Sequence, residues 1–122
     1  MALPTGSGSE ILKSSLVNNI AGSAQALTDL IDLTASGIWI ATVLSVSVCN
    51  MDANENGFIN LSVITTGSVE IQLVHKHPLS FEQTFVWNDP VVIQDGEKFA
   101  FSRETAAGTY DIVCSYILQD WS

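Results

Sequence analysis

Hydrophobic and polar residues alternate with a period of two along most of the chain, which is typical of half-buried β-strands. The clearest example is Phe81–Phe101, which begins with an aromatic face that holds Phe81, Phe85 and Trp87. Asn88-Asp89-Pro90 is expected to end that strand, because proline lacks an N–H donor. Val91–Ile93, a turn at Asp95-Gly96 and a strand at Lys98–Phe101, with Phe99 and Phe101 on one face, then complete a predicted β-meander.

The other strands are expected to pack around this meander. The β-branched run Ile38–Asn50 predicts a central strand. Strict alternation gives it one face with Ile40, Thr42, Leu44, Val46 and Val48, and another with Trp39, Ala41, Val43, Ser45, Ser47 and Cys49. Asn56-Gly57 predicts a hairpin from this strand into the next, at Phe58–Thr66. A further strand begins at Val69, and Thr109–Gln119 predicts a last strand with the inward face Tyr110, Ile112, Cys114, Tyr116 and Leu118.

Two segments near the start have weaker patterns. Glu10–Ala26 fits a helical stripe loosely, but Ser14-Ser15 and Asn18-Asn19 favour an edge strand, which is the interpretation adopted. Gln25–Leu33 is expected to be a strand or a single helical turn. Together, about eight strands at spacings of about ten residues predict an all-β, antiparallel β-sandwich of the jelly-roll or immunoglobulin-like kind. Residues 1–9 are expected to form an extended N-terminal arm, and residues 10–122 a single sandwich domain.

Composition and charge narrow the classes of partner. The chain has 122 residues, 47% of them hydrophobic and only 14% charged, so part of its surface is expected to be covered by other subunits in a homo-oligomer, a trimer or a ring. A large ligand cavity is the alternative use for so many apolar residues. The formal charge of −9, with four scattered basic residues, argues against binding to nucleic acid or to anionic membranes. No secretory signal is recognisable, so synthesis and assembly in a cytoplasm are expected.

Two motifs hint at metal ligands, and both have a simpler interpretation. Asp52, Asn54, Asn56 and Gly57 match the first half of an EF-hand loop, but its twelfth position is Val63 and strands flank it, so a polar turn is favoured. His75 and His77 would point to the same face of a strand, but no third ligand can be named. Two surface histidines are therefore expected.

The cysteines and aromatic residues are expected to be structural. Cys49 and Cys114 are predicted to be free thiols, although a bridge between neighbouring strands is conceivable. Six aromatic residues could form a sugar-binding face, but positions in the core or at a subunit interface are favoured for them. They are Trp39, Phe81, Phe85, Trp87, Phe99 and Phe101. No nucleophile, zinc or phosphate motif occurs, so no catalytic, cofactor-binding or metal-binding residue and no enzymatic activity is predicted.

Four segments carry a family resemblance. They are the MALPTGSGSE opening, Thr84–Asp89 (TFVWND), Thr109–Leu118 (TYDIVCSYIL), and Val43–Asn50 (VLSVSVCN) with the polar turn after it. Taken in their order along the chain, they resemble small structural proteins of tailed phages from marine and cyanobacterial hosts. The resemblance implies a virion component that contacts major capsid or other virion proteins, and it transfers no catalytic residue. With the acidic charge it favours a decoration (cement) protein on the capsid exterior. A neck, collar, tail or fibre-adaptor subunit, or a carbohydrate-binding module for the host surface, is the alternative.

Overall fold

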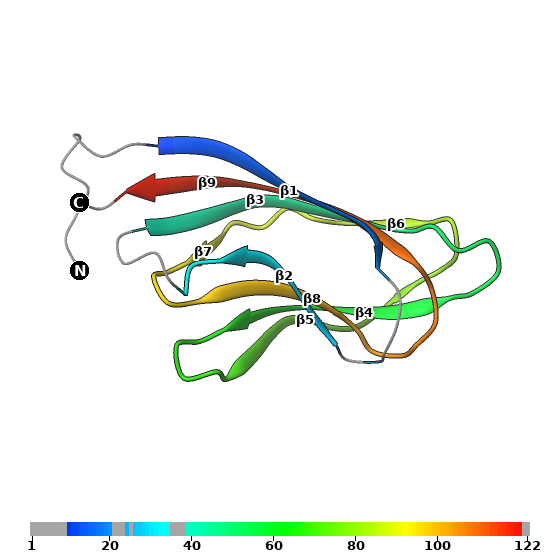
Figure 1. The fold of residues 1–122 in the computed structure, drawn as a ribbon. Coiled ribbons are helices and arrows are strands. Elements are labelled where there is room, and N and C mark those ends of the chain that lie inside the picture. Colours follow the sequence, from blue (N-terminus) through cyan, green and yellow to red (C-terminus); the bar gives the residue numbers. More distant parts are fainter. Residues whose placement is uncertain (1–9, 21–23, 25, 35–38, 121–122) are drawn as a thin grey trace.

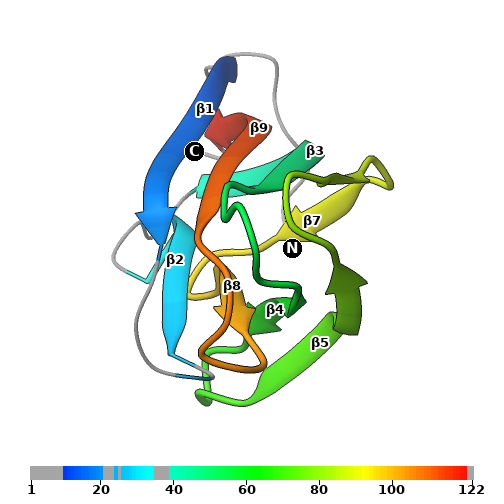
Figure 2. The same ribbon diagram turned by 90° about the vertical axis from the view of Figure 1, so that its right-hand side faces the viewer.

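The chain forms two antiparallel β-sheets packed face to face in a computed structural model that describes residues 10–20, 24, 26–34 and 39–120. Figures 1 and 2 show the sheets as two layers, and the predicted β-sandwich is therefore confirmed. The strands are β1 (Glu10–Ile20), β2 (Leu27–Asp32), β3 (Trp39–Asn50), β4 (Gly57–Ile64), β5 (Glu70–Leu79), β6 (Thr84–Trp87), β7 (Val91–Ile93), β8 (Lys98–Arg103) and β9 (Tyr110–Asp120). No helix long and apolar enough to cross a membrane occurs in these described ranges.

The strand order is that of a jelly roll. Sheet A has the order β1-β9-β3-β6, with β7 also paired to β3, and sheet B has the order β2-β8-β4-β5. Both β6 and β7 run antiparallel to β3, along its Val46–Cys49 and Ala41–Val43 parts, so they act as one strand interrupted at residues 88–90. Counted in this way, eight strands form two four-stranded sheets in which the chain crosses repeatedly from one sheet to the other.

This topology corrects two predictions. Phe81–Phe101 is no meander, because β6 and β7 belong to sheet A whereas β8 pairs with β2 and β4 in sheet B. The Asn56-Gly57 sequence does not close a hairpin, because β3 and β4 also lie in different sheets. Each local turn signal marked a real end of a strand. The partner of the next strand was set by contacts distant in sequence.

The edge strands near the N-terminus agree with the predictions. Residues 10–20 form β1, which pairs with β9 and is, among the described strands, the edge of sheet A. The segment at 27–32 forms β2, the edge of sheet B, and not a helical turn. The predicted arm at residues 1–9 lies outside the described residues.

The core between the sheets contains the inward faces predicted for the last two strands. Phe99 and Phe101 of β8 are fully buried, as are Tyr110 and Cys114 of β9, with Ile112 nearly so. They pack with Ile59 and Leu61 of β4, Val43, Val46 and Val48 of β3, and Ile93 of β7.

A β-bulge in β3 reverses the alternation predicted for Ile38–Asn50. The pairing with β9 shifts between Val43 and Ser45, so Leu44 is an extra residue on the β3 side. Before the bulge the odd-numbered positions face the core, and after it the even-numbered ones do. The two predicted faces were wrong for this reason: Val43 and Val46 share the inner face, while Leu44 and Ser45 lie on the outer one.

One end of the sandwich is closed around Tyr110. Its phenol donates a hydrogen bond to the carbonyl of Ala107 (3.0 Å), and the Arg103 guanidinium lies over its ring at 5.8 Å from the centroid. Burial raises the pKa of this phenol. Gly57 and Gly108 lie so close that a Cβ on either would overlap the Tyr110 side chain, and Gly108 has a φ of +90°. Only glycine fits there without rearrangement.

Candidate interaction surface

The Asp52–Gly57 loop uses its oxygen atoms to hold its own backbone. The Asp52 carboxylate accepts hydrogen bonds from the amides of Asn54 (2.8 Å) and Glu55 (2.9 Å), and these bonds lower its pKa. The Asn56 side-chain oxygen accepts the amide of Phe81 at 3.1 Å. These contacts make the loop a tie between strand ends.

The two histidines do not share a face. His77 packs against Phe85 of sheet A, with ring centroids 4.3 Å apart, whereas His75 borders a polar hollow on sheet B. Between them Lys76 has a positive φ of 51°, and the pairing of β5 with β4 is irregular there. The same-face expectation was therefore wrong. Within the part of the chain that the structure describes, no three His, Cys, Asp or Glu residues are placed to hold a metal ion.

Most of the candidate aromatics belong to the interior. Phe99 and Phe101 are fully buried, and Trp39, Phe85 and Trp87 pack against the core from its margins. Phe81, which is 40% exposed, lies in the turn before β6. The core interpretation is thus the better one, and these rings form no continuous sugar-binding face.

The cysteines lie on opposite faces of sheet A. Cys114 is buried in the core, and burial raises the pKa of its thiol to about 12. Cys49 lies on the outer face, where its sulfur is 3.4 Å from that of Met51. Both are free, as predicted, since side chains on opposite faces cannot meet the geometry of a disulfide.

The outer face of sheet A is the most distinctive surface of the molecule. Its side chains form three rows across the strands, fixed by the pairing of β1, β9, β3 and the interrupted β6–β7 strand. We name them the Leu16 row (Leu16, Val113, Ser47, Val86), the serine row (Ser14, Ser115, Ser45) and the Leu12 row (Leu12, Ile117, Thr42, Val92). Leu12 and Leu16 are each 72% exposed.

No charge interrupts these three rows. Among the described side chains of the paired strands on this face, charged groups stand at its two ends, at Glu10 and at Asp111, and Asp89 lies outside the rows, in the break between β6 and β7. We call the area between them the uncharged face. On a chain of formal charge −9 this is an uneven distribution, because carboxylates are spread over sheet B and the loops. A neutral sheet face rich in exposed aliphatic residues is the kind of surface that other protein surfaces cover.

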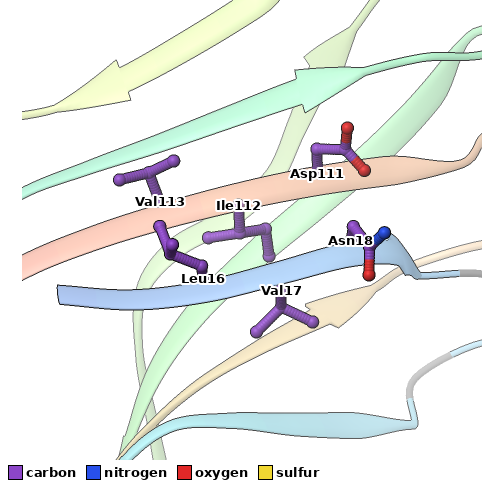
Figure 3. A pocket seen from close by; sticks show the side chains of 6 residues that line it. All are labelled: Leu16, Val17, Asn18, Asp111, Ile112 and Val113. Atoms are coloured by element: carbon purple, nitrogen blue, oxygen red, sulfur yellow. The ribbon is translucent and has the colours of Figure 1, made fainter.

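A hollow of about 270 Å³ opens at the margin of the uncharged face. It lies where β1 bulges, because Asn18 and Asn19 together stand opposite Asp111 of β9. Figure 3 shows Leu16 and Val113 beside one another at this hollow, while Val17 points to the other side of β1, where it packs against the core. A bulky apolar side chain from a partner would find room there.

The outer face of sheet B is different in kind. The buried side chain of Asn60 donates to Ser102 (3.2 Å) and Glu104 (3.0 Å), and Ser62 donates to Glu70 at 2.7 Å. Ion pairs join Lys76 to Glu104 and Lys98 to Asp29. The polar side chains of this face are thus joined to one another by hydrogen bonds and ion pairs, whereas the rows of the uncharged face present mainly aliphatic and hydroxyl side chains.

Sequence reasoning did not find the uncharged face. The alternation Leu12-Ser14-Leu16 was visible, but its alignment with residues about a hundred positions later depends on strand register. The bulge in β3 also hid the fact that Thr42 shares a face with Ser45 and Ser47.

Comparison with solved structures supports the fold. The chain is similar to a subunit of Bacillus endospore appendages, a family of disulfide-linked pili (TM-score 0.55, 10% identity, covering 100% of this chain and 97% of the other). It is similar to the xylan-binding CBM22-1 domain from Paenibacillus barcinonensis (0.51, 10%, 98% and 89%). A third similar chain comes from the virus-like particle of the extra small virus of the prawn Macrobrachium rosenbergii (0.50, 6%, 100% and 85%). No protein-family model and no curated protein sequence matches the chain. At such low identities these likenesses show the fold alone.

Proposed function

We propose that this protein is a non-enzymatic structural subunit of a virion, and specifically a decoration protein on the outside of a capsid. The observation that carries the proposal is the uncharged face, a four-strand-wide apolar and hydroxyl surface on a chain of formal charge −9. Such a surface suits a protein whose work is to bury area against other subunits.

Charge and fold support the same proposal. Strong net negative charge repels packaged nucleic acid and keeps an outward-facing subunit soluble. The jelly roll is a frequent architecture of viral capsid and lectin domains. A virus-like particle and a pilus contain chains of similar fold, and both are assemblies of repeated subunits.

The carbohydrate-binding alternative has lost its main support. It required the aromatic side chains on one exposed face, and most of them are within or beside the core. A neck, collar or tail subunit shares every feature above and is the competing proposal.

Copy number per particle separates decoration from neck or tail. Quantitative mass spectrometry of purified particles should find on the order of hundreds of copies for a lattice-wide decoration protein, against about a dozen for a neck or tail ring. A count near a dozen would refute the decoration role.

The N-terminal arm at residues 1–9 is expected to reach across to neighbouring subunits and tie them together. Deleting residues 1–9 should therefore weaken attachment to particles while the thermal unfolding of the sandwich is unchanged, and equally tight attachment would exclude the arm as a tether.

A further inference from the structure

The rows of the uncharged face repeat about its centre. From β1 through β9 and β3 to the interrupted strand, the Leu16 row reads Leu, Val, Ser, Val, and the Leu12 row reads Leu, Ile, Thr, Val. The serine row lies midway between them. The surface therefore has an approximate internal two-fold symmetry, although the residues come from four strands distant in sequence.

We propose that the uncharged face binds a second copy of this chain, across a two-fold axis that runs along the serine row. Rotation about that axis stacks each strand over its own counterpart. It places the Leu16 row of one copy over the Leu12 row of the other, so that leucine meets leucine, Ser47 meets the hydroxyl-bearing Thr42, and the remaining β-branched residues meet β-branched residues. An isologous interface requires this self-complementarity.

The contacts on and beside the axis are chemically matched. Each serine of the serine row meets its own counterpart, and a hydroxyl can both donate and accept, so identical hydroxyls can pair. The partner's Leu12, 72% exposed in the single chain, lies over Leu16 and the adjacent hollow. A projecting leucine thus faces the recess in the β1–β9 pair.

Charge also favours a second copy as the occupant. Two molecules of charge −9 repel, and contact through sheet B or the loops would bring their carboxylates together. The uncharged face allows close approach with the fewest facing charges. A basic partner would instead be drawn to the acidic surfaces.

The area of the uncharged face sets the expected strength of the dimer. With strands about 4.8 Å apart and eight residues of strand between the charged ends, the face measures about 19 Å by 27 Å, or roughly 500 Å² per copy. The total of roughly 1,000 Å² is at the lower limit for specific association. The isolated pair should therefore be weak, and further contacts in an assembly would consolidate it.

Sedimentation equilibrium from about 10 µM to 1 mM tests the pairing. A monomer–dimer equilibrium is expected, and it should strengthen as salt rises from about 0.05 to 0.5 M, because salt screens repulsion between like charges. Leu16→Asp and Val86→Asp should each weaken the dimer by at least about 30-fold, since an unpaired charge would be buried. Ile71→Asp is the matched control: it is a half-exposed residue of β5 in sheet B, and its change should leave the dimer intact.

A monomer at every concentration and salt, or equal losses in all three variants, would overturn the proposal. So would binding of a basic protein through this face that weakens with salt, because a different partner would then occupy it.

Crosslinking tests the two-fold axis itself. In a Cys49→Ser background, Ser115→Cys lies on the axis and should crosslink to its own copy through a reagent matched to the roughly 10 Å spacing of stacked sheets. Gln119→Cys should not crosslink to itself, but should crosslink to Asp111→Cys when the two variants are mixed, since these positions lie equally far from Ser115 on β9. Self-crosslinking of Gln119→Cys without the mixed product would refute this axis.

The proposed dimer rests on the proposed function, because a decoration protein needs a surface that binds other subunits. The dimer and the decoration role can nevertheless fail separately. Loss of pairing with undiminished attachment of Leu16→Asp to particles would remove the two-fold interface and leave the decoration role. A protein that dimerises in solution but is absent from purified particles would keep the two-fold interface and refute the decoration role.

Discussion

Replacing Asn50 with alanine should destabilise the sandwich more than almost any other polar substitution. The Asn50 side chain is fully buried at the end of β3, where its amide donates to the carbonyls of Glu55 (3.0 Å) and Leu79 (3.1 Å). Its oxygen accepts the amide of Asp52 at 3.1 Å. Because Leu79 ends β5 in sheet B, this one side chain ties the two sheets together.

Three hydrogen bonds at about 1 kcal/mol each, with their partners left in a poorly hydrated site, give an expected loss of about 3–4 kcal/mol. For a domain of this size that loss lowers Tm by about 10–15 °C. Asn50→Asp should be worse at pH 7 than at pH 4. The ionised carboxylate faces two carbonyl oxygens, which raises its pKa in the folded state, so the destabilisation grows as pH rises above the unfolded value.

Differential scanning calorimetry and urea unfolding measure both effects. Asn54→Ala is the control, because its exposed side chain makes no hydrogen bond to the described residues, and a change below about 0.5 kcal/mol is expected. A loss below about 1 kcal/mol for Asn50→Ala would show that the bonds are replaced by water and that the sheets are held by apolar packing alone.

Three further predictions concern reactivity, a turn and pH. Two thiols should titrate in the denatured protein without reductant, whereas in the native protein Cys49 should react with a thiol reagent much faster than Cys114, and equal rates would contradict the burial described. Gly108→Ala should cost at least about 2 kcal/mol in urea unfolding, because of its positive φ and the overlap with the tyrosine ring, whereas Gly67→Ala, whose Cβ would make only an ordinary 3.9 Å contact with the Thr65 hydroxyl, should be near neutral. The lowered pKa of Asp52 stabilises the fold above the unfolded carboxylate pKa, and this contribution is lost as pH falls through the folded pKa; Asp52→Asn should therefore flatten the acid limb of a Tm–pH curve, and an unchanged limb would contradict the assignment.

Alternation predicted the presence of most strands, because each strand has one buried and one exposed face. It gave the inner face of β9 correctly, since Tyr110, Ile112 and Cys114 follow one another without a bulge. It failed in β3, where the single extra residue Leu44 reverses the alternation. A bulge of this kind has no local sequence signal here.

Pairing between strands was beyond local reasoning for a different reason. The Asn56-Gly57 and Asp95-Gly96 signals describe how the backbone turns, and a turn can lead either to a neighbouring strand or across to the other sheet. The choice depends on the summed burial of distant strands. The uncharged face and the role of Asn50 both follow from that choice, so neither could be predicted from a segment taken alone.

The break between β6 and β7 has a consequence for how the molecule behaves at high concentration. Sheet A has one margin formed by the single long strand β1, which is regular from Glu10 to Val17, and an opposite margin divided at Pro90, which offers no N–H to a strand laid beside it. Head-to-tail fibre growth would require the margin of each molecule to dock on the opposite margin of the next along its whole length. Pro90 and its neighbours therefore oppose every step of such edge-to-edge growth, because each added molecule would have to pair with the interrupted margin.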